Sequence, residues 1–311
     1  MKAGPQHETY SIQHKASKLL QICFMFHASG FMIYFIYLIF GTAPSIIWLL
    51  FFLRKDAHPE SVRMVISVFL LGAAIIPLVF IFECLPVGAD FGTGDIKCFS
   101  SLFFLGGKFP RLLGLVLQTF LVVALIEEIA KYLIVRLRVL RDPEFDEPLD
   151  IMLYMIVAAL GFAALENILY LYSSGETFLR QEGATASFST LLLIIFGTGF
   201  FRFIGATLLH ALCSATIGFF IARSFCQVKY RKLLFLAGFF FAVVLHGLFN
   251  LSIINIVGYL NALVNGQTTP AYFQVFIASV FAIIVILAGL AIFVTFGFRN
   301  LKKLSSTCKI K

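Results

Sequence analysis

Seven long apolar segments separated by short polar loops make up most of this chain. We place them near residues 30–53, 64–82, 111–137, 151–172, 200–222, 233–254 and 271–298. About 20 apolar residues in a helix cross the hydrocarbon core of a bilayer, so each segment is long enough to span a membrane. Because 60% of the residues are hydrophobic and only 13% are charged, too few polar residues remain to cover a water-facing globule. The sequence therefore predicts an all-α, polytopic integral membrane bundle of about seven helices.

The N-terminal part leaves the number of spans open. Apolar character already begins at Leu19, and Pro44 can kink or break a helix, so residues 12–27 either lie on the membrane or belong to an eighth crossing. No cleavable signal peptide is evident. Residues 84–110 and 183–199 are too short or too interrupted for spans, and we expect interfacial or re-entrant segments there. The predicted organisation is an N-terminal tail (1–29), one membrane domain (30–298) and a basic C-terminal tail (299–311).

The net charge of +8 does not indicate a nucleic-acid partner, because the basic residues fall in short clusters between the apolar segments. Such clusters instead indicate which loops of a membrane protein face the cytoplasm. These clusters lie on alternate sides of the spans, and basic loops face the cytoplasm. We therefore expect a cytoplasmic C-terminus and 136–150 loop, in a cell (plasma) membrane. The six cysteines are scattered without a CxxC motif, which argues against a zinc ribbon. Cys84 and Cys98 share one predicted external loop and are either a disulfide or two unpaired cysteines.

A few polar residues lie deep within the apolar segments, where ionisable groups are costly unless they face one another or water. They are Glu127, Glu128, Lys131, Glu166, Asn167, Arg202, His210, His246 and Asn250. Counted from the expected inner ends at about 1.5 Å per residue, the glutamates and histidines lie roughly 18–24 Å from the cytoplasmic edge. Any one of them alone is readily explained as a helix–helix hydrogen bond, and Arg202 as a snorkelling side chain. Five ionisable groups at compatible depth instead predict one shared site.

Helical spacing indicates which of these side chains meet. Glu127 and Glu128 are four and three residues from Lys131, so the lysine can neutralise one carboxylate while the other stays free. Phe162 and Glu166 share a helix face, as do His246 and Asn250. Small residues beside them allow the helices to approach closely.

These motifs, in this order, resemble the PrsW family of intramembrane proteases. The resemblance is carried by E127-E128-x-x-K131, by F162-x-x-x-E166-N167, by a histidine in the next span (His210) and by H246-x-x-x-N250. It extends over about residues 31–255 and implies a relation to type II CAAX prenyl endopeptidases. It also implies cleavage of a membrane-embedded protein substrate, in the best-known case an anti-sigma factor.

Two mechanisms suit the implied peptide hydrolysis. In a glutamate-type mechanism, Glu127 or Glu128 accepts a proton from water, His246 and Asn250 stabilise the oxyanion, and His210 holds the water. In a zinc mechanism, Glu166, His210 and His246 bind the metal, and Glu127 or Glu128 is the base. The residues leave the choice open, and no HExxH motif is present.

A non-catalytic alternative uses the same buried polar cluster. A membrane scaffold would use it for helix assembly, and a transporter for proton coupling. The lack of clear internal repeats and of symmetrically broken helices counts against a secondary transporter. Beyond a membrane-embedded substrate and the lipid bilayer, the sequence predicts no partner and no oligomeric state.

Overall fold

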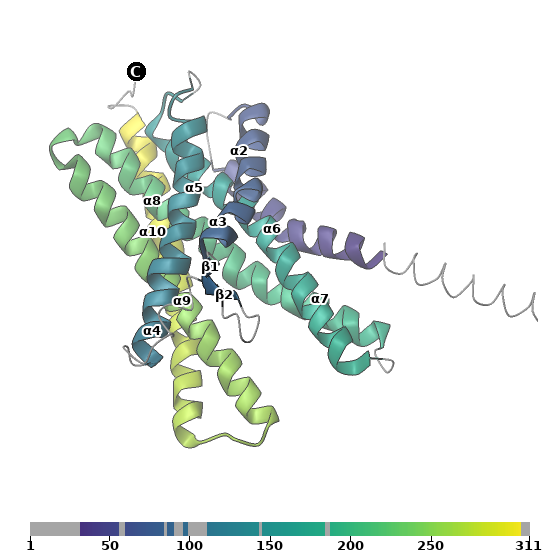
Figure 1. The fold of residues 1–311 in the computed structure, drawn as a ribbon. Helices are drawn as coiled ribbons and strands as arrows, with labels where there is room; N and C mark the ends of the chain where they lie inside the picture. Colours follow the sequence, from purple (N-terminus) through teal and green to yellow (C-terminus); the bar gives the residue numbers. More distant parts are fainter. Residues whose placement is uncertain are drawn as a thin grey trace, which may run out of the picture.

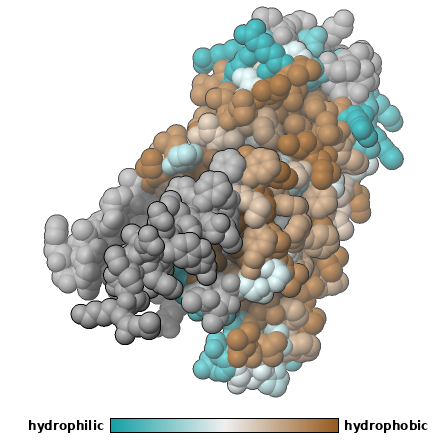
Figure 2. Space-filling model, turned by 90° about the vertical axis from the view of Figure 1, so that its right-hand side faces the viewer, coloured by the Kyte–Doolittle hydropathy of each residue, from teal (hydrophilic) through white to brown (hydrophobic). Residues whose placement is uncertain are grey.

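The computed structural model describes residues 32–55, 60–83, 86–89, 96–98, 111–142, 145–183 and 187–305. Within these residues, seven helices are long and apolar enough to cross a membrane. They are Met32–Leu53, Val62–Glu83, Leu112–Arg138, Pro148–Glu182, Phe188–Cys226, Val228–Val264 and Pro270–Leu304. The prediction of a seven-span helical membrane protein is confirmed. Figure 2 shows apolar residues over the middle of one face and hydrophilic residues at its two ends, as expected for a bundle surrounded by lipid.

Several of these spans consist of more than one helical element. The second span joins α2 (Val62–Ala74) to α3 (Ile76–Glu83). The third joins α4 (Arg111–Leu117), a π-helical segment (Gln118–Ala124) and α5 (Leu125–Arg138). The fourth is α6 (Pro148–Glu182), and the fifth joins α7 (Phe188–Arg202), a second π-helical segment (Phe203–Thr207) and α8 (Leu208–Cys226). A 3-10 turn (Val228–Tyr230) then leads into α9 (Arg231–Val264), and α10 (Pro270–Ser305) follows.

Helix α6 is the central helix of the bundle. In the 18-residue apolar window of this span, 94% of the residues are buried. Its start is fixed by Pro148 in the first turn and by a capping box in which Glu147 and Asp150 bond each other's backbone. Helices α2, α5, α8 and α10 pack around α6 (Figure 1). A helix buried on all sides can be apolar all round, which explains the absence of a polar stripe over residues 151–165.

Close packing around α6 depends on glycine. A Cβ at Gly161 would overlap the backbone carbonyl of Phe69 on α2, and one at Gly218 on α8 would lie 2.6 Å from the Cα of Met152. Small residues at such crossings let helix backbones touch in a membrane, where van der Waals packing replaces the hydrophobic effect between helices. The residues on these helices are therefore held at fixed separations.

Two π-helical segments lie just before polar residues of interest. Gln118–Ala124 ends three residues before Glu127, and Phe203–Thr207 ends three residues before His210. A π-helical segment adds residues to a turn, so it rotates every side chain after it around the helix axis. Such segments are frequent at functional sites. Both helices therefore change register immediately before the candidate site.

Some details differ from the sequence predictions. Residues 188–202 form helix α7, which continues through the π-helical segment into α8 and is not a separate interfacial or re-entrant segment. The first helix passes Pro44 without a break. Strands β1 (Pro86–Ala89) and β2 (Ile96–Cys98) form a small antiparallel pair within the 84–110 segment. Residues 12–27 and the predicted Cys84–Cys98 alternative lie outside what the structure describes.

Candidate active site

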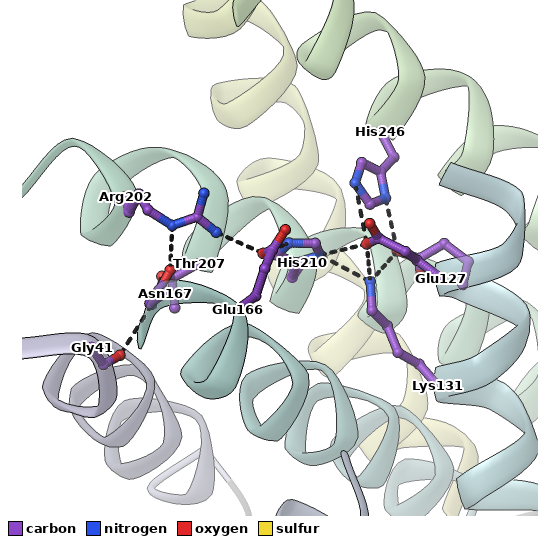
Figure 3. A network of polar contacts seen from close by, with 10 residues as sticks. Gly41, Glu127, Lys131, Glu166, Asn167, Arg202, Thr207, His210 and His246 are labelled. Atoms are coloured by element: carbon purple, nitrogen blue, oxygen red, sulfur yellow. Dashed lines mark hydrogen bonds and ion pairs between the residues drawn. The ribbon is translucent and has the colours of Figure 1, made fainter. Parts of the chain in front are cut away.

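Polar side chains from five helical elements meet in the interior of the bundle (Figure 3). Helix α5 contributes Glu127, Glu128 and Lys131, α6 contributes Glu166 and Asn167, the end of α7 contributes Arg202, α8 contributes His210, and α9 contributes His246. The two adjacent glutamates, Lys131, Asn167 and both histidines are buried. The structure thus brings together residues that lie up to about 120 positions apart in the sequence.

Glu128 is the most completely bonded carboxylate of the cluster. Its Oε1 accepts hydrogen bonds from Lys131 Nζ at 2.8 Å and from His246 Nδ1 at 3.0 Å, and its Oε2 accepts one from Ser214 Oγ at 2.8 Å. The side chain has no exposed surface. Buried charges are tolerated when they are paired and their remaining lone pairs are satisfied. Glu128 therefore has the environment of a structural ion-pair partner that orients Lys131 and His246.

Lys131 links the two glutamates to the first histidine. Besides its contact with Glu128, its Nζ lies 3.4 Å from Glu127 Oε2 and donates to His210 Nδ1 at 2.9 Å. The ammonium also lies 4.6 Å from the centroid of the Phe162 ring, a cation–π distance. One lysine is thus surrounded by two carboxylates, an imidazole and an aromatic face, which explains how a charge is held with no exposed surface.

A second chain of contacts holds His210 from its other side. His210 Nε2 donates to Glu166 Oε2 at 2.9 Å, and Arg202 binds the same oxygen at 2.6 Å through one terminal nitrogen. Arg202 Nε also donates to Asn167 Oδ1 at 2.6 Å, and its guanidinium lies 4.0 Å from the ring centroid of Tyr170. A carboxylate behind an imidazole fixes the orientation of the ring and the nitrogen that carries the proton.

Asn167 extends this chain of contacts to the backbone. Its Nδ2 donates to the carbonyl of Gly41 on the first helix at 3.2 Å and to Thr207 Oγ1 at 3.0 Å. Thr207 is the last residue of the π-helical segment before α8. Asn167 thus connects α6, the first helix and the segment that sets the register of His210 (Figure 3).

Glu127 lies where the two imidazoles converge. Its Oε2 is 3.7 Å from His210 Nδ1 and 3.8 Å from His246 Nε2, longer than direct hydrogen bonds. Because a carboxylate accepts, the outer nitrogens His210 Nε2 and His246 Nδ1 donate to Glu166 and Glu128. The inner nitrogens, His210 Nδ1 and His246 Nε2, therefore face the space beside Glu127, where His210 Nδ1 also accepts a hydrogen bond from Lys131.

This arrangement fits a divalent metal. Glu127, His210 and His246 each offer one ligand atom, and these atoms lie within 4.8 Å of one another. Two histidines and one carboxylate form a common donor set for catalytic zinc, and carboxylates behind the ligand imidazoles are its usual support. Lys131 competes for this space, since its ammonium is bonded to His210 Nδ1. A metal there would displace that hydrogen bond while the contact of Lys131 with Glu128 remains available.

The carboxylate of this donor set differs from the sequence prediction. The prediction places Glu166 with His210 and His246, whereas the grouped atoms belong to Glu127 and the same two histidines. Glu166 contacts the outer nitrogen of His210 and is shared with Arg202. The geometry favours Glu127 as the ligand and Glu166 as the residue that orients His210.

Among the described residues, one predicted site residue, Asn250, makes no hydrogen bond to the cluster, and two residues that were not predicted, Ser214 and Glu83, do interact with it. Asn250 lies one helical turn beyond His246 and is half-buried, and its side chain makes no hydrogen bond within the described part of the chain. Ser214, which bonds Glu128, was not predicted, although its spacing of four residues from His210 places both on one face of α8. Glu83 at the end of α3 was also missed. One of its oxygens is buried without a hydrogen-bond partner in the described residues, and Glu83 acts electrostatically on Glu127 and Glu166.

Within the described residues, seven helices able to span a membrane surround a buried cluster of carboxylates and imidazoles, which defines a polytopic membrane protein with ionisable side chains inside its bundle. Residues 60–288 match the family model of the PrsW family intramembrane metalloproteases, and the chain belongs to this family. The family resemblance predicted from the motifs is thereby confirmed. The chain is an intramembrane protease, a hydrolase whose substrates are membrane-embedded proteins.

Several curated relatives carry the name Protease PrsW. The protein from Geobacillus kaustophilus is 29% identical over 213 residues, which cover 68% of this chain and 76% of the relative. The Oceanobacillus iheyensis protein is 26% identical over 213 residues, covering 68% of this chain and 79% of the relative. The Bacillus subtilis protein is 34% identical over 140 residues, covering 43% and 53%. No solved structure is significantly similar to this chain.

Proposed function

We propose that this protease cleaves a regulatory membrane protein, such as an anti-sigma factor, in or near its membrane segment, with Glu127 at the centre of the reaction. The observation that carries the proposal is the convergence of Glu127 Oε2 with the inner nitrogens of His210 and His246. Glu128 and Glu166 are held by contacts of 2.6–3.0 Å, whereas the contact of Glu127 with Lys131 is longer, at 3.4 Å. Glu127 is therefore the carboxylate best placed to accept a proton from water.

The remaining residues have separate roles in this proposal. Glu128 and Glu166 orient His246 and His210 from behind, so the imidazoles present acceptor nitrogens to the water. Lys131, whose ammonium contacts both glutamates, stabilises negative charge that develops beside Glu127. Asn250, on the same face of α9 as His246, donates its amide to the oxyanion once substrate fills the site.

Zinc is the metal that the donor set of Glu127, His210 and His246 would hold. When bound, zinc would polarise the carbonyl group of the scissile peptide bond and activate a water molecule at neutral pH. The name of the family supports this assignment, as does the combination of two imidazoles and a carboxylate. The roles of Glu128, Glu166 and Arg202 in orienting the imidazoles are the same with and without the metal.

The basic ends of the helices support a topology for the proposed reaction. Arg136, Arg138, Arg223, Lys229 and the basic residues of α10 after Phe298 follow spans that end on the side of the C-terminus. We propose that this side is cytoplasmic and that the protein resides in the plasma membrane. A cysteine introduced after Lys303 should then resist a membrane-impermeant thiol reagent in intact cells and react in inverted vesicles.

The test begins with finding a substrate. New protein N-termini are compared by mass spectrometry in membranes of cells that express the wild type or Glu127→Gln, and a fragment specific to the wild type identifies the substrate. Cleavage is then measured with both purified proteins in proteoliposomes. We expect Glu127→Gln to lower the rate at least 100-fold, in the range of a lost general base or metal ligand. Glu176→Gln, at an exposed ion pair on α6, is the matched control and should cleave normally.

One result would contradict the central role of Glu127, and a second measurement tests the metal. If correctly folded Glu127→Gln cleaves within a few-fold of the wild type, Glu127 is not the central group. A strong zinc chelator tests the metal: activity that is lost and then restored by added zinc supports zinc, whereas full activity of metal-stripped protein excludes it.

A further inference from the structure

A groove outside the catalytic cluster lies between the first helix, α8 and α10. It has a volume of about 370 Å³ and is lined by Trp48, Phe51, Phe52, Lys55, Leu208, Leu212, Ala291, Val294, Thr295, Phe298, Arg299 and Lys302. The lining residues of α10 recur at intervals of three and four, as do those of the first helix, so each helix contributes one continuous stripe. The groove therefore runs along the helices rather than across them.

Both stripes change from apolar to basic residues at the same end of the groove. On the first helix, the aromatic residues Trp48 and Phe52 precede Lys55. On α10, the apolar residues from Ala291 to Phe298 precede Arg299 and Lys302. Phe52 and Phe298 stack with their ring planes 14° apart, which joins the two stripes directly below the cations. The groove is thus apolar along its length and has three positive charges at one end.

The three cations have no acidic partner within the part of the chain that the structure describes. No carboxylate among the described residues forms an ion pair with Lys55, Arg299 or Lys302, and all three side chains are exposed. Lys55 instead lies over the ring of Phe51, with its Nζ 4.7 Å from the centroid. Three cations around one opening repel one another, and an anion between them removes that repulsion.

The dimensions match one leaflet of a bilayer. From Ala291 to Lys302 the α10 stripe rises about 16 Å, at about 1.5 Å per residue. Half of the hydrocarbon core measures about 15 Å. The cations therefore lie about where lipid phosphates lie, and the apolar wall from Ala291 to Phe298, about 10 Å long, covers about two thirds of the depth of the acyl chains in one leaflet.

We propose that this groove is a binding site for an anionic phospholipid, with the phosphate among Lys55, Arg299 and Lys302 and an acyl chain along the aromatic and aliphatic walls. Basic pockets between membrane helices on the cytoplasmic side are the usual sites of such lipids. The occupant is a lipid rather than a free phosphate ion, because the greater part of the lining is apolar. The proposal is independent of the proposed catalytic mechanism.

The groove shares two structural elements with the catalytic cluster. Trp48 donates its indole N–H to the carbonyl of Phe203 at 3.1 Å, at the start of the π-helical segment that precedes His210. Leu208 and Leu212 stand two residues on either side of His210 on α8. A lipid seated against these side chains contacts the back of the helix that carries a candidate metal ligand.

The test is native mass spectrometry of the full-length protein in detergent with added phosphatidylglycerol or phosphatidylcholine. We expect a one-lipid adduct that strongly prefers phosphatidylglycerol. The triple variant Lys55→Gln/Arg299→Gln/Lys302→Gln should bind it about 100-fold more weakly, since each basic residue near an anionic surface contributes about fivefold. The control Arg136→Gln/Lys229→Gln/Lys232→Gln removes the same charge outside the groove and should bind like the wild type.

A second variant separates the lipid from a simple phosphate site. Thr295→Trp keeps all three cations and fills the apolar groove, so it should abolish the phosphatidylglycerol adduct, and inorganic phosphate should not displace the lipid from the wild type. Equal binding by the triple variant and its control would overturn the proposal, as would displacement by inorganic phosphate. An adduct that shows no preference between the two lipids would overturn it as well.

Discussion

Glu127 and Glu128 are adjacent on α5, yet their contacts predict opposite consequences when glutamine replaces each of them. Glu128 accepts hydrogen bonds from Lys131, His246 and Ser214 at 2.8–3.0 Å and has no exposed surface. The Glu128→Gln change keeps the shape of the side chain but removes its charge. Lys131 is then left with its longer contact of 3.4 Å to Glu127.

The expected loss of stability depends on whether each substitution leaves a buried charge without its partner. Removing one partner of a buried ion pair costs about 3–5 kcal/mol, because the remaining charge stays buried without compensation. We expect Glu128→Gln to lower the free energy of unfolding by that amount. Glu127→Gln leaves the 2.8 Å pair of Glu128 and Lys131 intact, so it should cost only about 1 kcal/mol while abolishing cleavage.

The assay is reversible unfolding of the purified protein in mixed micelles with increasing sodium dodecyl sulfate, run beside the cleavage assay. The double variant Glu128→Gln/Lys131→Met removes both charges of the pair and should recover much of the stability that Glu128→Gln loses, without recovering cleavage. If Glu127→Gln unfolds as readily as Glu128→Gln, or if Lys131→Met adds to the loss instead of offsetting it, the division of roles between the two glutamates is wrong.

Two further predictions concern the positioning of the site. Arg202→Gln should lower kcat about 10–100-fold with little change in KM, because Glu166 then loses the guanidinium that holds it against the imidazole of His210. Arg202→Lys keeps the positive charge and should restore part of this loss. Equal losses in both variants would contradict a role that depends on charge. Gly161→Ala should destabilise the protein by about 1–3 kcal/mol in the same unfolding assay, since its Cβ would overlap the carbonyl of Phe69. Gly197→Ala, with nothing within 4 Å of its Cβ position, is the control, and similar effects at both glycines would refute this packing argument.

The spans were predictable because hydrocarbon imposes length and composition on any helix that crosses it. All seven predicted segments correspond to helices in the structure, although α6 and α9 are each about three turns longer than predicted and α10 is about two turns longer. Hydropathy underestimates such helices because their ends carry polar residues, such as Glu182 on α6 and Lys302 on α10. The same reasoning missed α7, whose glycines and threonine weaken the apolar pattern over residues 197–199 without breaking the helix.

The members of the cluster were also predictable, but their relative positions were not. Depth along a helix follows from residue counting, so the sequence places Glu127, Glu166, His210 and His246 near one level. The direction of a side chain around its helix depends on register, and the π-helical segments before Glu127 and His210 rotate both by an amount that spacing does not reveal. Residue counting therefore leaves open which carboxylate faces the two histidines: the prediction takes Glu166 and keeps Glu127 or Glu128 as the base, whereas the geometry groups Glu127 with the histidines.

The charge balance of the cluster gives a physical reason for the special position of Glu127. The three carboxylates that form ion pairs in the cluster, those of Glu127, Glu128 and Glu166, are matched by two cations, Lys131 and Arg202, and Glu83 adds one more acidic side chain nearby. Lys131 lies closest to Glu128 and Arg202 contacts Glu166, both at 2.8 Å or less, so the unmatched charge resides at Glu127. An uncompensated charge is costly in a buried membrane site and favours the binding of one more cation. Zinc and a proton taken from water both meet that need, and both would bind at the carboxylate that faces the inner imidazole nitrogens, where zinc would replace the hydrogen bond from Lys131 to His210 Nδ1. The same imbalance therefore suits Glu127 to either form of peptide hydrolysis, whereas Glu128 and Glu166, already neutralised, are suited to holding the imidazoles in place.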